Sequence, residues 1–293
     1  MHVGVVILPN HRWADARPIW QRAEALGAHT AWTYDHLTWR DLRDGPWLSA
    51  FPLLTAAAGV TTTLRLGTLV TSPNFRHPVT LAKEAMTLDD ISGGRLTLGI
   101  GAGGVGWDAE ALGQQPWSRA ERTSRFTELV DHLDRLLTAP ATDRLDGSWY
   151  QAVDARNLPG CVQQPRLPFA VAGGGPRALE VAARHAQTWV TFGDPLRADE
   201  LDDAGCVEVV RRQSAALDEA CERVGRDPAT LARLYMEGAT GEPWLQSVGA
   251  FTDLAGRYAE LGFTDLALHW PRAEPPYQSD PAVFEAIMAT VNA

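Results

Sequence analysis

The chain has 293 residues, of which 45% are hydrophobic, so it can bury a large core and is too long for a small repeat module or a disulfide-stapled mini-protein. Its 26 Lys and Arg against 36 Asp and Glu give a net charge of −10, with no basic run, which argues against nucleic acid or an anionic membrane as the main partner. The 3 cysteines, Cys161, Cys206 and Cys221, lack any paired short spacing, so neither a disulfide framework nor a four-thiolate zinc site is expected.

The amino terminus indicates no secretory leader, because Met1 runs directly into an apolar stretch without a basic segment or a small-residue cleavage pattern. No apolar run approaches the roughly 18 residues that span a bilayer. We therefore expect a cytoplasmic protein whose partner is a small organic molecule.

Short apolar runs alternate with stretches of helical periodicity, the pattern of parallel strands joined by crossover helices. Strands are predicted at residues 3–8, 29–34, 64–70, 96–101, 168–172, 188–192, 231–237 and 265–270. Helices are predicted at residues 14–26, 47–59, 78–91, 118–137, 176–185, 206–224, 244–261 and 280–290. Gly27 and Gly262 stand where helix C-caps are expected, and Pro78 and Pro176 stand in first helical turns.

This eight-fold alternation predicts a closed (β/α)₈ TIM barrel that forms a single domain over residues 1–293, because an open doubly wound sheet rarely uses so many units. Residues 139–168, rich in Pro, Gly and Asp, fit neither period. We interpret them as an insertion between the fourth helix and the fifth strand.

The active site of such a barrel is made by the carboxyl ends of the strands and the loops that follow them. This rule selects Pro9, Asn10, His11, Asp35, His36, residues 71–77 and 101–108, Gly173, Gly174, Gly175, Gly193, Asp194, Gly238, Pro271 and Arg272.

Asp35 and His36 are the candidate catalytic residues, because an imidazole beside a carboxylate at a strand end can exchange a proton near neutral pH. The alternative is a structural pair that caps or satisfies the core. Trp32, Trp39 and Trp47 lie nearby in the sequence and either wall a planar ligand or pack in the core.

Two glycine-rich segments follow strands. Gly99, Gly101 and Gly104 match the dinucleotide spacing G-x-G-x-x-G but follow the fourth strand, so we favour a flat ring lying against bare backbone, with a simple tight turn as the alternative. The run at residues 172–176 leaves the fifth strand and enters a helix. The unpaired backbone amides of the first helical turn and the helix dipole predict a phosphate-binding site there. A plain β-to-α turn is the alternative there.

Other chemistries lack the residues that they need. A barrel aldolase needs a lysine at a strand end, but Lys83, the sole lysine, lies inside a predicted helix, which argues against that activity. The histidines are dispersed along the sequence, so no metal site is predicted. The motif G-x-S-x-G is absent, and a pair of catalytic carboxylates is only weakly suggested by Asp108 or Glu110 with Glu237. A site with few reactive side chains suits a cofactor that supplies the difficult chemistry.

A set of short motifs carries a family resemblance. They are Leu-Gly-Thr at 66–68, Phe-Arg-His-Pro at 75–78, Leu-Ala-Lys at 81–83, Thr-Leu-Asp at 87–89 and Ser-Gly-Gly-Arg at 92–95. Together with Asp35-His36 and the glycine run at 172–175, they resemble the bacterial luciferase-like superfamily over most of residues 1–195. That superfamily comprises flavin-dependent monooxygenases and reductases and dehydrogenases that use the deazaflavin coenzyme F420, on a (β/α)₈ barrel with an insertion. The Asp-His pair and Gly-Ile-Gly-Ala-Gly at 99–103 are most similar to its F420 branch.

The resemblance implies a set of site residues. Asp35 and His36 would lie near the reactive edge of the cofactor ring. The cofactor would be bound by Leu69, Val70, Thr71, Gly101, Ala102, Gly103, Ala172, Gly173, Gly174 and Gly175, the last three holding the tail phosphate. The family often has a cis peptide bond that here falls at Leu69–Val70. Members that oxidise a sugar phosphate carry an acid where this chain has Gly104, which argues against that substrate.

The leading hypothesis is hydride transfer between coenzyme F420 and a small organic substrate, with His36 exchanging a proton. One alternative keeps the fold and uses reduced FMN, as a monooxygenase. Another is a cofactor-binding protein without catalysis. A homodimer is expected because dimers are common in the superfamily.

Overall fold

The structure, a computed structural model, describes residues 1–104 and 106–292. Eight parallel strands close into a barrel in the order β1-β10-β9-β8-β7-β4-β3-β2. Their bounds are β1 His2–Val6, β2 Thr30–Thr33, β3 Arg65–Thr68, β4 Leu96–Gly101, β7 Phe169–Ala172, β8 Thr188–Thr191, β9 Ala232–Met236 and β10 Asp265–His269. The predicted (β/α)₈ TIM barrel is confirmed, and the Leu69–Val70 peptide bond is cis as expected.

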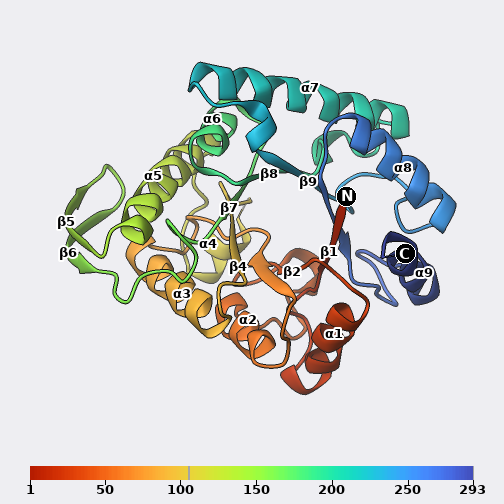
Figure 1. Ribbon diagram of the computed structural model, residues 1–293, viewed down its shortest axis with the longest axis horizontal. Coiled ribbons are helices and arrows are strands. Elements are labelled where there is room, and N and C mark those ends of the chain that lie inside the picture. Colours follow the sequence, from red (N-terminus) through yellow and green to blue (C-terminus); the bar gives the residue numbers. More distant parts are fainter. Residues whose placement is uncertain (105, 293) are drawn as a thin grey trace.

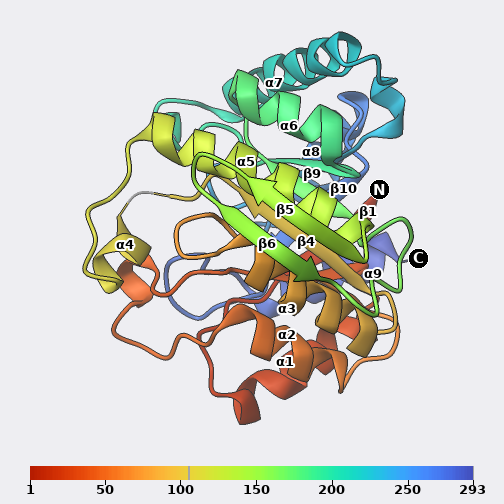
Figure 2. The same cartoon turned by 90° about the vertical axis from the view of Figure 1, so that its left-hand side faces the viewer.

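The crossover helices form a ring outside the strands (Figure 1). They are α1 Trp13–Ala25, α2 Ala50–Ala58, α3 Pro78–Ile91, α5 Arg119–Thr138, α6 Pro176–His185, α7 Asp203–Arg223, α8 Val248–Glu260 and α9 Pro281–Val291. A short helix, α4 Trp107–Ala111, and the 3₁₀ turns η1 Arg40–Leu42, η2 Pro195–Arg197 and η3 Pro228–Thr230 were not expected from the sequence. In Figure 2, α4 lies among the loops at one end of the barrel, whereas the N-terminus lies at the other.

Capping side chains set several helix boundaries that periodicity misplaced. The helix predicted from residue 206 begins at Asp203, because the Asp202 side chain accepts a hydrogen bond from the Gly205 amide. The helix predicted from residue 244 begins at Val248, where Ser247 caps it. Trp47 lies in the loop before α2 and donates its indole N–H to the His36 carbonyl over 2.9 Å.

The insertion lies between α5 and β7 as expected and contains an antiparallel hairpin, β5 Ala141–Asp146 with β6 Gln151–Arg156. Figure 2 shows this hairpin on the outside of the barrel, beside α5. The Glu128 carboxylate of α5 fixes its turn by accepting hydrogen bonds from the amides of Ser148, Trp149 and Tyr150 at 2.9, 2.9 and 2.6 Å. The hairpin escaped the sequence analysis because polar residues occupy both of its faces.

The barrel interior contains one large side chain on β2, Trp32, which is 4% exposed and packs in a cluster with Val6 and Leu234. Two glycines make room for it: a Cβ atom at Gly4 would lie 3.0 Å from Trp32 Nε1, and one at Gly67 would overlap the Trp32 ring. Trp32 therefore belongs to the core and does not wall a ligand. Towards the carboxyl ends, the interior includes the small Ala172 and the half-buried Val70 beside the larger Tyr34.

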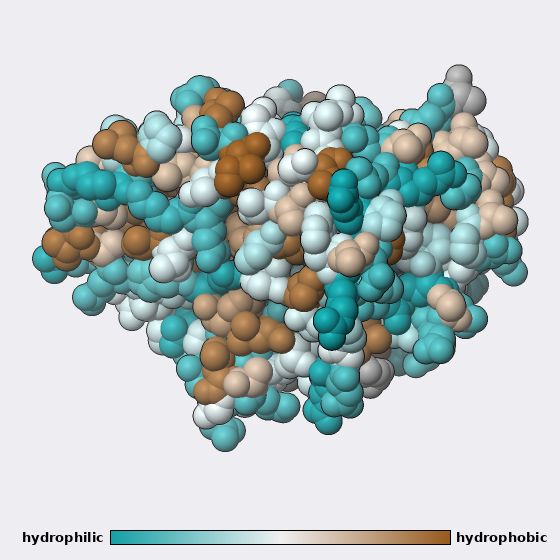
Figure 3. Space-filling view, turned by 90° about the horizontal axis from the view of Figure 1, so that it is seen from below, coloured by the Kyte–Doolittle hydropathy of each residue, from teal (hydrophilic) through white to brown (hydrophobic). Residues whose placement is uncertain are grey.

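The outer surface is mixed in character. On the face seen from below in Figure 3, hydrophilic and hydrophobic residues are interspersed. Leu196, Val153 and Leu158 are exposed apolar side chains on three separate segments. Within the described ranges, none of the helices combines the length and the hydropathy that a membrane crossing requires.

Candidate active site

The carboxyl ends of β2, β3, β4 and β7 bring most of the expected site residues to one mouth of the barrel. Thr71 continues β3 past the cis bond, since its amide donates to the Gly99 carbonyl over 2.8 Å and its carbonyl accepts from the Gly101 amide over 2.9 Å. The Val70 side chain turns inward over β4, so that a Cβ atom at Gly101 would lie 2.8 Å from Val70 Cγ2. Gly101 therefore makes room for Val70, and Val70 presents the apolar surface on which a ring would lie.

His36 is held by a carboxylate from a distant part of the chain. Its Nδ1 lies 2.9 Å from Oδ2 of Asp108, at the start of α4, and the side chains of His36 and Asp108 are 12% and 2% exposed. Asp108 also accepts hydrogen bonds from the Leu37 amide at 2.8 Å and from Asn74 Nδ2 at 3.2 Å. Burial acts to raise the pKa of Asp108, but the hydrogen bonds from His36, Leu37 and Asn74 lower it overall.

This arrangement fixes the tautomer of His36. An ionised Asp108 can only accept, so His36 Nδ1 carries the proton and Nε2 keeps a free lone pair. Trp39 packs beside the ring, with centroids 4.6 Å apart. His36 can therefore accept a proton at Nε2, and the resulting imidazolium is stabilised by Asp108.

Asp35 has a different environment from the one that the sequence suggested. Its carboxylate is buried and receives Arg76 Nε at 3.0 Å, Arg76 Nη2 at 2.7 Å and Thr71 Oγ1 at 2.6 Å. Asp35 and His36 are successive residues, so their side chains leave the backbone in opposite directions. The Asp35 carboxylate joins the end of β2 to the loop after β3, and the partner of His36 is Asp108.

The glycine run after β7 enters α6 without a side-chain cap. Gly173 has φ of +152°, and a Cβ atom there would lie 2.6 Å from Ala178, whereas a Cβ atom at Gly175 would meet nothing within 4 Å. The first amides of α6 have no intrahelical acceptor, and the helix dipole places positive potential there. The turn is thus tight at Gly173 and open at Gly175.

A second polar network lies in the same mouth, and of its residues the sequence analysis had named Glu237 alone, as one of a weakly suggested pair of catalytic carboxylates. Glu237, after β9, accepts from the His269 amide at 2.6 Å and lies 2.8 Å from His269 Nδ1. His269 Nε2 lies 2.8 Å from the Tyr34 hydroxyl, which is 3.3 Å from that of Tyr277. The Tyr277 and His269 rings stack with centroids 3.6 Å apart. Burial and the neighbouring Tyr277 raise the pKa of Tyr34 well above its ordinary value.

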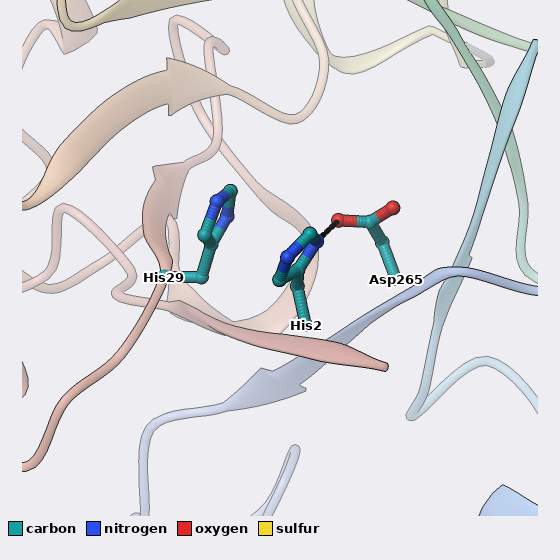
Figure 4. Close-up of side chains that lie close together, drawn as sticks. All are labelled: His2, His29 and Asp265. Carbon is teal, nitrogen blue, oxygen red and sulfur yellow. Dashed lines mark ion pairs between the residues drawn. The ribbon is translucent and has the colours of Figure 1, made fainter. Parts of the chain in front are cut away.

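The opposite end of the barrel gathers two histidines that the sequence had indicated as dispersed. His2, His29 and Asp265 lie together at the amino ends of β1, β2 and β10 (Figure 4), with His2 Nδ1 3.4 Å from Asp265 Oδ1. The two rings stack with centroids 4.2 Å apart and planes 15° apart. Ring lone pairs lie in the ring plane, so parallel rings direct them side by side and not towards one ion.

Comparison with known proteins places the chain in a family. A family model described as luciferase-like monooxygenase matches residues 1–236. The chain is 31% identical over 296 residues to an F420-dependent glucose-6-phosphate dehydrogenase of Beutenbergia cavernae, with 86% of each protein covered. It is also 31% identical over 209 residues to a 4-hydroxyprotoasukamycin monooxygenase of Streptomyces nodosus subsp. asukaensis, covering 63% of this chain and 54% of that protein.

Solved structures share the fold at lower identity. An F420-dependent secondary alcohol dehydrogenase in complex with an F420-acetone adduct matches with a TM-score of 0.78 at 17% identity, covering 99% of each chain. The F420-dependent tetrahydromethanopterin reductase of Methanopyrus kandleri matches with a TM-score of 0.74 at 16% identity, over 99% of this chain and 96% of that one. The chain therefore belongs to the luciferase-like monooxygenase family and is an oxidoreductase on a (β/α)₈ barrel.

Proposed function

We propose that the protein transfers hydride between coenzyme F420 and a small organic substrate. The observation that carries the proposal is the His36–Asp108 pair, whose imidazole is 12% exposed at a mouth that also offers the apolar Val70 side chain and a helix without a side-chain cap. The similarity to an F420-dependent dehydrogenase over 86% of the chain supports the same cofactor.

The residues at the mouth fit a flat, phosphorylated cofactor. Val70 and Ala172 would contact the ring, and Ala102 and Gly103 would border it, because these are partly exposed or small residues at the ends of β3, β4 and β7. Gly173, Gly174 and Gly175 would bind the phosphate through backbone amides. When bound, F420 supplies a ring carbon that accepts or donates hydride.

His36 would supply the accompanying proton transfer. In the oxidation of an alcohol, His36 Nε2 would take the hydroxyl proton, while the bound cofactor would supply the hydride acceptor that leaves a carbonyl product. In the reverse direction, His36 returns the proton to the carbonyl oxygen. Asp108 keeps Nδ1 protonated throughout and stabilises the charged imidazole.

A second candidate function is an FMN-dependent monooxygenase. It is favoured by the 31% identity to a monooxygenase, although that match covers 63% of the chain. Reduced FMN reacts readily with oxygen, whereas a reduced deazaflavin reacts slowly, so the two candidates differ in their need for oxygen.

The test is a pair of turnover assays, one with reduced F420 and one with reduced FMN, each run against a panel of alcohols, ketones and aldehydes with and without oxygen. The proposal expects substrate-dependent oxidation of reduced F420 that is unchanged when oxygen is removed. Turnover with FMN alone, accompanied by oxygen uptake, would establish the monooxygenase. Cofactor binding without any turnover would favour a binding protein.

A further inference from the structure

An acidic cleft of about 340 Å³ opens at the carboxyl end of the barrel, beside the loop that follows β9. Glu237 and Glu242 line it, together with Tyr277, Gln246 and Gln278. No Lys or Arg is among the described residues that line it. The cleft thus shares Glu237 and Tyr277 with the polar network at the mouth, and its charged groups are of one sign.

Glu237 places its negative charge towards this cleft. Its Oε1 accepts both the amide and the ring hydrogen bonds of His269, whereas Oε2 has no hydrogen-bond partner in the part of the chain that the structure describes. On its other side, His269 Nε2 lies 2.8 Å from the Tyr34 hydroxyl, so both ring nitrogens of His269 have a polar neighbour. Glu237 therefore keeps one carboxylate oxygen for a donor that enters the cleft.

Glu242 adds a second carboxylate, whose hydrogen-bond donors among the described residues are hydroxyl groups. It accepts hydrogen bonds from the hydroxyls of Tyr235 at 2.6 Å, Tyr258 at 2.9 Å and Thr240 at 2.9 Å. Burial raises its pKa, against the opposing effect of these three donors. Of the two carboxylates, Glu237 is the one with a free oxygen.

Two arginines lie near the cleft but outside its lining, and the first of them, Arg40, packs its guanidinium 4.6 Å from the centroid of the Trp39 ring. Arg272 follows β10, and its guanidinium Nε donates to the backbone carbonyls of Glu274 at 3.4 Å and Pro276 at 2.9 Å. It thereby holds the loop that carries Tyr277. An anion entering the cleft would face Glu237 at short range, in a site whose partial burial strengthens the repulsion.

We infer that this cleft is the substrate pocket and that it takes an organic substrate bearing a positively charged amine, with Glu237 as the group that selects it. The inference rests on the proposed function for the identity of the reaction, since the substrate must lie beside the cofactor. The ammonium group of the substrate would donate to Glu237 Oε2, and phosphorylated substrates would be rejected. Tyr277 would contact the substrate's carbon skeleton.

Binding can be tested on the whole protein without cofactor, which separates this inference from the proposed reaction. The probes are benzylammonium, benzyl alcohol and benzyl phosphate, which share a ring and differ in charge, measured by titration calorimetry at pH 7. We expect benzylammonium to bind about 10-fold or more tightly than benzyl alcohol, and benzyl phosphate not to bind. Equal or tighter binding of benzyl phosphate would overturn the inference.

The matched variants are Glu237→Gln and Glu274→Gln, which each remove one negative charge at the same end of the barrel. Glu237→Gln should abolish the preference for benzylammonium, whereas Glu274→Gln, on an exposed loop, should change it less than about 2-fold. An unchanged preference in Glu237→Gln would contradict the inference.

A second variant keeps the test decisive if Glu237→Gln does not fold. Gln246 is exposed at the edge of the cleft, so Gln246→Lys adds a cation there without removing a buried contact. It should weaken benzylammonium and allow benzyl phosphate to bind. If it leaves both affinities unchanged, the cleft does not bind these probes and the inference fails. If the wild-type protein prefers benzylammonium as expected but shows no turnover with F420, the result counts against the proposed function alone.

Discussion

Two histidine–carboxylate pairs stand in the same mouth with opposite orientations. In the first, the His36 side chain is 12% exposed and its partner Asp108 is 2% exposed. In the second, His269 is 1% exposed and its partner Glu237 is 10% exposed. The first pair therefore presents an imidazole to the open space and buries the acid, whereas the second presents the acid and buries the imidazole. A histidine paired with a carboxylate can thus serve proton exchange in one orientation and charge recognition in the other.

The largest effect is expected from removing the imidazole that faces the mouth. In His36→Asn, the amide can still donate to Asp108, but the base at Nε2 is lost, so kcat should fall about 10³-fold with the thermal unfolding midpoint unchanged. Steady-state kinetics with the substrate found in the F420 assay measures this. The control is His2→Asn, an exposed histidine at the opposite end of the barrel, which should change kcat less than about 2-fold. An unchanged kcat in His36→Asn would show that the His36–Asp108 pair has a structural role and not a catalytic one.

The next effect concerns the ion pair that fixes the chain beside His36. Arg76→Met leaves the Asp35 carboxylate buried with only Thr71 as a side-chain donor among the described residues, so the free energy of unfolding should fall by about 3 kcal/mol. Urea denaturation measures it. Arg22→Met provides the control, because Arg22 pairs with Glu285 on the exposed surface. Similar losses in both variants would contradict a buried structural role for Asp35.

A third histidine–carboxylate pair lies away from the mouth, and its contribution to the free energy of unfolding should depend on pH. His185 at the end of α6 lies 2.8 Å from Asp131, and although burial lowers its pKa, the hydrogen bonds to Asp131 and Asp134 raise it to about 9. A raised pKa gives stability that is fully present below the unfolded value of 6.5 and is lost as the pH rises towards 9. His185→Gln should therefore cost about 2 kcal/mol at pH 6 and almost nothing at pH 10.

Chemical denaturation of wild type and His185→Gln across this pH range checks the sign. The variant should keep the wild-type kcat, because His185 lies outside the mouth. A loss that grows with rising pH would show that the histidine is neutral in the folded protein.

The smallest effect is expected for the exposed pair of Arg22 with Glu285, whose side chains are 49% and 46% exposed. Arg22→Ala should change the free energy of unfolding by less than about 1 kcal/mol, and salt should reduce the difference further. Thermal unfolding at two salt concentrations measures it. A larger effect would mean that surface pairs matter as much as those at the mouth.

The fold was predictable because each strand and helix carries its own period, and the predicted and observed bounds of β4, α3 and α6 agree. The elements that were missed lack such a signal. Helix α4 has 5 residues, too few for a helical period to be visible, and the β5–β6 hairpin is polar on both faces.

The site was less predictable, because its contacts join distant segments. His36 was found from its position after β2, but its partner Asp108 lies 72 residues further along. Tyr34, Glu237 and His269 come from the ends of β2, β9 and β10, which are brought close only when the barrel closes through β1. Inward alternation within β10 places His269 on the same side as Ala267, and this was the available signal for it.

The most direct test of the account is a binding titration of the purified protein with F420 and, separately, with FMN, followed by the fluorescence of each cofactor. The account predicts saturable binding of F420 at one site per chain, with FMN at least about 10-fold weaker. Saturable binding of FMN alone, or no saturable binding of either cofactor, would contradict it.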